Sequence, residues 1–222
     1  MINPKIPFTF LITSHNEGVE LRRLVSQILP FTLTSNSEIV IVDDFSSDPI
    51  LIDVLKELSH HSNVTILLKK FNNSFADQKN YGLLFCKGRY IIQLDADEFL
   101  ASKFLINVQF LISSHDFDLL KVPRVNIVNN LSTEDQLKWS WLQNEHGWIN
   151  WPDWQSRVFR NTPTIRYNGA IHESPQNCEK ILFMDPDASL SIIHIKELQK
   201  QNIQNELYEK ISNYPFNISN DM

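Results

Sequence analysis

A chain of 222 residues is long enough to bury one sizeable core and is short for two independently folded domains, so we expect a single domain. The formal net charge is -6, without long runs of one sign, which disfavours nucleic-acid binding because such proteins present a basic face. No apolar run approaches the roughly 18 residues of a membrane span, and the first seven residues lack the pattern of a secretory signal.

The two cysteines, Cys86 and Cys178, are far apart and match neither a zinc-binding pattern nor a disulfide framework. We expect both to be free thiols in a reducing compartment. The predicted location is therefore the cytoplasm. Peripheral work at the cytoplasmic face of a membrane is an option that the sequence leaves open.

Short apolar runs alternate with helical patterns over the first hundred residues, which is typical of parallel strands joined by crossover helices. Pro30 is expected to end a helix over 19–29, and Gly88 to close a helix over 75–86 as a left-handed C-cap. The remaining expected elements are strands at 8–13, 38–42, 64–68 and 90–94 and a helix that opens at Pro49.

The second half is less regular. The segment 129–153 is polar and contains four of the five tryptophans, and we interpret it as a loop region that faces the substrate. The other expected elements are a helix at 104–112, strands at 119–128, 155–159, 165–167 and 190–195, and a charged C-terminal helix at 197–211.

Polar side chains follow three of the expected strands at the point where each strand ends. In open α/β sheets, ligands bind outside the carboxyl ends of the strands, so these residues are expected to share one rim. They are Thr13, Ser14, His15, Asn16 and Glu17 after the first strand, Asp43 and Asp44 after the second, and Asp95, Ala96, Asp97 and Glu98 after the fourth.

Asp95 and Asp97 are two residues apart, and in an extended segment they would point the same way and share one ligand. Mg²⁺ or Mn²⁺ commonly takes one or two carboxylates and fills its other sites with phosphate oxygens and water. The pair therefore predicts a divalent-cation site for a nucleotide diphosphate. The competing interpretation, a solvated turn, is weakened by the apolar strand that precedes the pair.

Four segments, 13–17, 39–48, 79–82 and 90–98, together resemble the family 2 glycosyltransferases of the GT-A fold. Farther along, 157–160, 168–173 and His194 resemble the branch that includes bacterial lipopolysaccharide-core glucosyltransferases. The resemblance implies a GT-A fold, with a Rossmann-like, mostly parallel central sheet flanked by helices. It also implies a nucleotide-binding half, 1–100, and an acceptor-binding half, 101–222, that ends in the C-terminal helix.

The resemblance also implies roles for individual residues. Lys79 stands where the family commonly has arginine and would meet the nucleotide or diphosphate, although a helix-surface lysine is the alternative. His194 would join Asp95 and Asp97 at the metal, although a buried core histidine is the alternative. The implied donor-binding residues are Thr13, Ser14, Asn16, Glu17, one of Asp43 and Asp44, Lys79, Asp95 and Ala96.

An inverting transfer needs a general base within hydrogen-bond reach of the acceptor hydroxyl. Glu173 is the first candidate, because related enzymes have an acidic residue at its position. Asp153, between Trp151-Pro152 and Trp154, is the rival, and a base elsewhere stays open.

We therefore predict an inverting, Mn²⁺- or Mg²⁺-dependent glycosyltransferase of the hexosyltransferase class. It would move a sugar from a nucleotide-sugar donor, preferably a UDP-sugar, to a hydroxyl of a saccharide or glycolipid acceptor. One alternative is a non-catalytic nucleotide-sugar-binding protein. Another is a sugar-1-phosphate nucleotidyltransferase. That class needs a glycine-rich basic loop after the first strand, and it is disfavoured because this chain has only Gly18 there.

Overall fold

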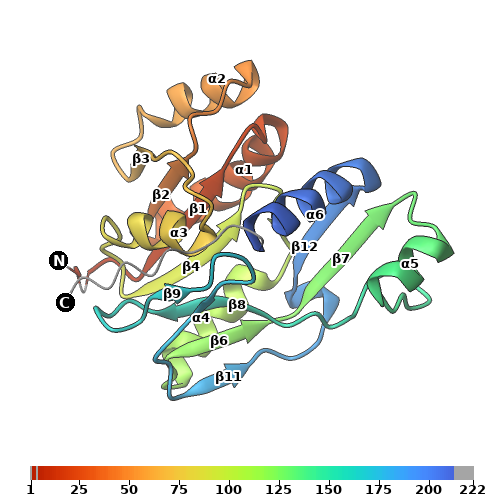
Figure 1. The fold of residues 1–222 in the computed structure, drawn as a ribbon. Coiled ribbons are helices and arrows are strands. Elements are labelled where there is room, and N and C mark those ends of the chain that lie inside the picture. The colour runs from red at the N-terminus through yellow and green to blue at the C-terminus, as the bar shows by residue number, and fades with distance from the viewer. Residues whose placement is uncertain (1, 4, 213–222) are drawn as a thin grey trace, which may run out of the picture.

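Figure 1 shows a computed structural model of the chain, which describes residues 2–3 and 5–212. A seven-stranded sheet has the order β11-β6-β8-β4-β1-β2-β3, in which only β8 runs antiparallel to its neighbours. The expected α/β class with a mostly parallel central sheet is confirmed. The strands of this sheet are β1 (Phe8–Ser14), β2 (Glu38–Asp43), β3 (Val64–Leu68), β4 (Tyr90–Asp95), β6 (Leu119–Val122), β8 (Gln155–Arg160) and β11 (Ile181–Phe183).

Two smaller sheets and the helices complete the described part of the chain. The smaller sheets are β5-β12-β7, from β5 (Glu98–Leu100), β12 (Ile192–Glu197) and β7 (Arg124–Asn129), and β10-β9, from β9 (Tyr167–Asn168) and β10 (Ser174–Pro175). The helices are α1 (Gly18–Ser35), α2 (Pro49–Leu58), α3 (Phe75–Leu83), α4 (Phe104–Ser114), α5 (Thr133–Trp139), α6 (Leu198–Ser212) and the 3₁₀ turn η1 (Ala188–Leu190). Among these described helices, none is both long and apolar enough to cross a membrane.

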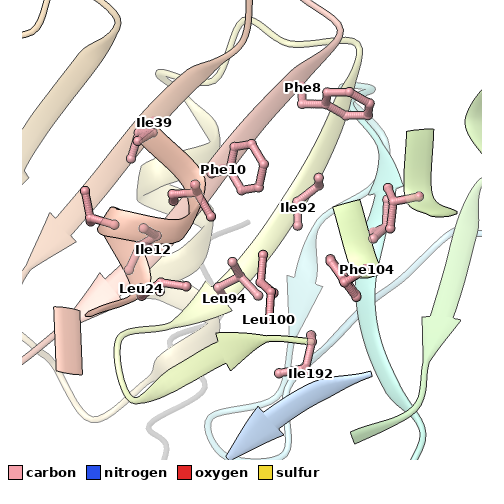
Figure 2. Packing of buried hydrophobic residues seen from close by; sticks show 14 of the residues in the cluster. Phe8, Phe10, Ile12, Leu24, Ile39, Ile92, Leu94, Leu100, Phe104 and Ile192 are labelled. Carbon is pink, nitrogen blue, oxygen red and sulfur yellow. The ribbon is translucent and has the colours of Figure 1, made fainter. Parts of the chain in front are cut away.

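Helices cover both faces of the central sheet. Alternate side chains of a strand point to opposite faces, so Ile12 and Ile39 pack with α1, α2 and α4, whereas Leu11 and Val40 pack with α3. Figure 2 shows the first of these layers, in which the phenylalanine, leucine and isoleucine side chains of β1, β2 and β4 pack together. Because both faces are covered, every residue of β2 is buried, and the residues between Glu38 and Asp43 form a continuous apolar run.

Helix α1 continues through Pro30, which we expected to end it. The helix ends at Ser35, and its C-cap Asn36 adopts the left-handed conformation with φ of 55°. The last turns carry Phe31, whose ring packs against Phe8 and Phe10 at centroid distances of 5.9 and 6.0 Å. A proline inside a helix costs about 3 kcal/mol, and the aromatic packing beyond Pro30 offsets that cost.

Gly88 does not cap α3, contrary to our expectation, because the helix ends at Leu83. The glycine is required for a different reason. A Cβ at Gly88 would lie 2.4 Å from backbone atoms of Phe8 and Thr9, where β1 passes. Its N–H donates to Thr9 Oγ1 at 2.8 Å, so this close approach fixes the start of β4 against β1.

The second half departs further from the expected elements. Pro123 divides the strand expected over 119–128 into β6 and β7, which belong to different sheets. The segment 129–153, expected to be a loop, includes the short helix α5, none of whose residues is buried. The strands expected at 165–167 and 190–195 form later in the chain, as β9 and β12.

Candidate active site

The polar residues expected at one rim do meet there, because β4, β1 and β2 are adjacent parallel strands. Thr13 pairs with Asp95 and Ser14 with Asp43 in the strand register. Backbone hydrogen bonds continue past the strand ends, from Ala96 N–H to the Thr13 carbonyl at 3.2 Å and from Asp44 N–H to the Ser14 carbonyl at 3.0 Å. The turns after these three strands therefore form one continuous surface.

Two side chains shape the loops after β1 and β2. Asn16, in the left-handed region with φ of 62°, accepts the backbone N–H groups of Ser47 and Asp48 at 2.8 and 3.0 Å. Asp43 is buried and accepts the Ser14 hydroxyl at 3.1 Å and the Ser46 hydroxyl at 2.6 Å. Asp43 therefore holds the end of β1 and the turn after β2 together.

Asp44 and Glu17 present carboxylates nearer to solvent. Asp44 accepts the backbone N–H of Phe71 at 2.8 Å and lies 3.4 Å from His15 Nδ1. Burial raises the pKa of Glu17 to about 7; the charge of Asp97 adds to this, whereas a hydrogen bond from the His15 backbone opposes it. Glu17 therefore changes its charge near neutral pH.

A connected set of seven charged side chains, which we term the charge cluster, lies beside these loops. Lys79, on α3, is buried rather than on the helix surface; its Nζ lies 2.5 Å from Glu173 Oε1 and 3.5 Å from Asp95 Oδ1. Arg157, on β8, lies 2.7 Å from the second oxygen of Asp95. The members in order of contact are Glu173, Lys79, Asp95, Arg157, Glu98, Arg124 and Asp153.

The other end of the charge cluster passes through β5 and β7. Glu98 is fully buried, and its carboxylate is 2.5 Å from Arg157 and 3.5 Å from Arg124. Arg124 is in turn 2.8 Å from Asp153. The two candidate bases, Glu173 and Asp153, thus end the same chain of alternating charges, and each is already paired with a cation.

Asp95 is held ionised at the centre of the charge cluster. Burial alone would raise the pKa of its carboxyl group. The guanidinium of Arg157 and the ammonium of Lys79 outweigh burial and keep that pKa well below its usual value. Removing one partner of a buried ion pair costs about 3–5 kcal/mol, and this cost applies to the most buried pairs of the charge cluster, Lys79 with Glu173 and Arg157 with Glu98.

Asp97 lies in a turn after β4 rather than in the extended segment on which we based its pairing with Asp95. Its Oδ2 is 3.2 Å from His194 Nε2 and 3.6 Å from Lys196 Nζ. Burial opposes ionisation of Asp97, but the His194 contact outweighs it and lowers the pKa of the carboxyl group. Asn126 Oδ1 holds the other ring nitrogen of His194 at 2.9 Å, so the imidazole orientation is fixed.

Asp97 and His194 are chemically suitable for a divalent cation, since carboxylate oxygen and imidazole nitrogen both bind Mn²⁺. Asp95, the third expected ligand, contacts the positively charged side chains of Lys79 and Arg157, and its role at the metal stays a prediction. Among the described residues, no three histidine, cysteine or carboxylate side chains converge as a ready-made metal site. Two protein ligands suffice when phosphate and water supply the rest.

Helix α6 borders the site. Figure 1 shows it between α3 and the β7–β12 pair. The Tyr208 ring lies 5.9 Å from Phe75 and 5.5 Å from His172. Burial, together with the negative charges of Asp95 and Glu173, raises the pKa of Tyr208 to about 12. Its hydroxyl therefore stays protonated beside the charge cluster.

Sequence reasoning missed part of this arrangement. The sequence predicts no role for Glu98 and Arg124, and for Arg157 it leaves open a place near phosphate or acceptor or a salt bridge at the surface. A buried charge leaves no signature of its own in a single sequence, because its partners come from distant strands. The one available signal was the position of Glu98 directly after Asp95-Ala96-Asp97.

Comparison with known proteins decides the family: the profile of "Glycosyl transferase family 2" matches residues 9–174, about three quarters of the chain. The chain belongs to glycosyl transferase family 2. The match extends from β1 to β10, so it contains the charge cluster and Asp97 but not His194.

Two curated relatives match part of this family 2 chain. The Bacillus subtilis minor teichoic acid biosynthesis protein GgaB is 26% identical over 119 residues, 52% of this chain and 13% of GgaB. An uncharacterized glycosyltransferase of Haemophilus influenzae is 29% identical over 90 residues, 40% of this chain and 29% of that protein. The chain thus spans less than a third of the length of either relative.

Solved structures confirm the fold of this family 2 chain. Residues 1–349 of S. aureus TarS superpose with a TM-score of 0.62 at 15% identity, covering 93% of this chain and 64% of that one. TarS structures in complex with UDP and with UDP-GlcNAc superpose with TM-scores of 0.60 and 0.58. At this identity the similarity concerns the fold.

Proposed function

We propose that this family 2 enzyme transfers a sugar from a UDP-sugar, with inversion, to a hydroxyl of a saccharide or lipid-linked saccharide. The observation that carries the proposal is the meeting of Asp97 and His194 with the charge cluster at the carboxyl rim of β4, β1 and β2. The complexes of TarS with UDP and UDP-GlcNAc support a uridine donor. The proposed hexosyltransferase class follows from the resemblance of the sequence to family 2 glycosyltransferases.

The donor end of the proposed reaction uses the loops after β1 and β2. Thr13, Ser14, Asn16 and Glu17 with Asp44 would surround the base and ribose. Asp97 and His194 would hold Mn²⁺ or Mg²⁺, which neutralises the charge that develops on the leaving diphosphate. Lys79 and Arg157 place two positive charges beside Asp95, which orients both.

The acceptor end requires one proton acceptor. Glu173 would take the proton from the attacking hydroxyl while the acceptor oxygen displaces the diphosphate from the opposite face, which inverts the anomeric centre. Asp153, at the far end of the charge cluster, is the second candidate. Within such a network, Lys79 positions Glu173.

A lipid-linked saccharide is the preferred acceptor because of the resemblance of 157–160 and 168–173 to the lipopolysaccharide-core branch. GgaB, whose name concerns minor teichoic acid, makes a polymer acceptor the alternative. Work at the cytoplasmic face of a membrane is part of the proposal. The free thiols of Cys86 and Cys178 support a reducing compartment.

Release of UDP from UDP-sugars, measured with Mn²⁺, with Mg²⁺ and in excess chelator, tests the proposal. We expect metal-dependent release, which Asp97→Asn abolishes and which Asp116→Asn, a change of an exposed carboxylate distant from the rim, leaves unchanged. Product NMR should show an inverted anomeric centre. UDP binding without release under any condition would make the protein a nucleotide-sugar-binding protein, and full activity in chelator would remove the metal from the mechanism.

A further inference from the structure

A pocket of about 650 Å³ lies outside the charge cluster, on the half of the chain that follows β7. One wall is the end of the segment 129–153, and the other is the stretch between β11 and β12. Its lining residues are Asn144, Glu145, His146, Trp148, Trp151, Pro186, Asp187 and Ala188.

Three aromatic rings form a continuous row in this pocket. The Trp148 ring lies 4.9 Å from Trp151 and 4.9 Å from His146. None of the three side chains is fully buried, and the His146 side chain is 59% exposed. Aromatic faces that line a hollow without entering the core are available to a ligand.

The polar groups around the aromatic row restrict the chemistry of that ligand. Glu145 and Asp187 contribute carboxylates, and hydrogen bonds from the Ser189 backbone and side chain lower the pKa of Asp187. Of the residues that the structure describes, no lysine or arginine lines the pocket. A phosphate or diphosphate would meet repulsion here, whereas sugar hydroxyls would find acceptors and a sugar ring would find apolar faces to stack on.

Both walls of the pocket connect to the candidate active site. On one side, Ile149 N–H donates to the Asn126 carbonyl at 2.8 Å, and the Asn126 side chain holds His194. On the other side, Asp187 precedes β12, the strand that carries His194. The segment with Trp151 continues into Asp153 at the end of the charge cluster.

We propose that this pocket binds a neutral sugar ring of the acceptor and so forms an acceptor subsite next to the transfer site. This inference rests on the proposed function, because it names what the same enzyme recognises in its second substrate. It assigns recognition to stacking on Trp148 and Trp151 with His146 at the edge of the row. The ligand class is a neutral saccharide rather than a phosphate-rich polymer.

Saccharide binding without any nucleotide tests the subsite independently of catalysis. Methyl glycosides of glucose, galactose and mannose serve as probes, in saturation-transfer NMR and fluorescence titration. We expect saturation of sugar ring protons with the native protein for at least one probe. Trp148→Ala should weaken binding by about ten-fold or more, and His146→Ala by less.

The substitution at Trp148 leaves the local backbone intact, because Trp148 N–H donates to Asn144 Oδ1 at 2.9 Å and its carbonyl accepts Asn144 N–H at 3.0 Å. The matched control is Trp139→Ala, since Trp139 pairs with Trp141 in the same region but does not line the pocket. UDP affinity, measured by calorimetry, should be the same in all variants and shows that each is folded.

Several results would overturn the subsite. These are the absence of binding for every probe at 100 mM, equal binding by the native protein and Trp148→Ala, or an equal loss in Trp139→Ala. Trp148-dependent sedimentation with phosphatidylglycerol vesicles, without sugar binding, would also overturn it. Failure of UDP release with retained sugar binding would instead refute the proposed function and leave the saccharide site standing.

Discussion

Glu173 is a carboxylate whose nearest cation is a buried lysine, and that contact bears on its proposed role. A base must be held at one place before the acceptor arrives, and Lys79 at 2.5 Å does this. Asp153 is held in the same way by Arg124. Each candidate base is therefore held by one positively charged side chain, and kinetics must separate them.

We expect Glu173→Gln to lower the turnover rate by roughly 10²-fold or more while leaving UDP affinity unchanged, because the amide cannot accept the hydroxyl proton. The checks are single-turnover kinetics for the rate and calorimetry for UDP. Asp153→Asn is the matched control, since it removes the charge at the opposite end of the charge cluster. If turnover fell in the Asp153 variant alone, the two roles would have to be exchanged.

Glu17 gives a second prediction at this scale, because its pKa is about 7 in the folded chain. The unfolded chain ionises this group near pH 4.5, so the folded state holds the proton between these values. The stability contributed by Glu17 is therefore complete below pH 4.5 and is lost as the pH rises through 7.

Glu17→Gln should remove the loss of stability that accompanies ionisation of Glu17. Urea unfolding at pH 5 and pH 8 should show a smaller decline of the free energy of unfolding in the variant, by roughly 1–3 kcal/mol. Glu20→Gln, three residues farther along, is the control and should decline as the native protein does. Parallel curves for native protein and Glu17→Gln would show that Glu17 ionises normally.

Elements in the first half could be predicted well, and the reason is their burial. A strand covered on both faces is a short apolar run, and β1, β2 and β4 begin at the expected residue, as does the less buried edge strand β3. The end of α1 could not be predicted, because Phe31 packs on residues of another element. The same holds for the site: rim residues follow strands, whereas Glu98 and Arg124 pair across strands that only the fold brings together.

Gly18 carries a prediction at the scale of elements, because α1 begins there against the start of α2. A Cβ at Gly18 would lie 2.4 Å from the backbone nitrogen of Leu51. Since neither backbone can yield without moving a helix, Gly18→Ala should destabilise the chain by roughly 1–3 kcal/mol and weaken UDP binding.

The control for this prediction is the neighbouring residue, Val19, whose side chain is 62% exposed. Val19→Ala should change the free energy of unfolding by less than about 0.5 kcal/mol. The stability of both variants is measured by urea unfolding, and their affinity for UDP by calorimetry. Equal stability of the two variants would mean that α1 and α2 separate without cost.

At the scale of the whole molecule, the two halves of the sequence share their sheets. The central sheet joins them where β4 pairs with β8, and the smaller sheet where β5 pairs with β12. The charge cluster crosses the same boundary, since Lys79 and Asp95 contact Glu173 and Arg157. The single domain expected from the sequence stays a prediction, and these shared contacts give it a test.

Fragments 1–100 and 101–222 should therefore not fold separately. Each alone should lack a cooperative urea transition, because the first exposes the β4 edge and the second lacks its central strands. Mixed together, they should regain UDP binding measured by calorimetry. A cooperative transition of 1–100 alone would show that the nucleotide-binding half is an independent domain.

The pairing of β5 with β12 also sets an order of events during translation. Glu98 lies opposite His194 in that pairing, and His194 contacts Asp97. His194 therefore leaves the ribosome almost a hundred residues after Asp97. The four parallel strands β3, β2, β1 and β4 can pair on the nascent chain long before that. A stalled ribosome carrying residues up to β8 would thus carry Asp97 without His194, and the proposed cation site would be complete only after synthesis has passed β12.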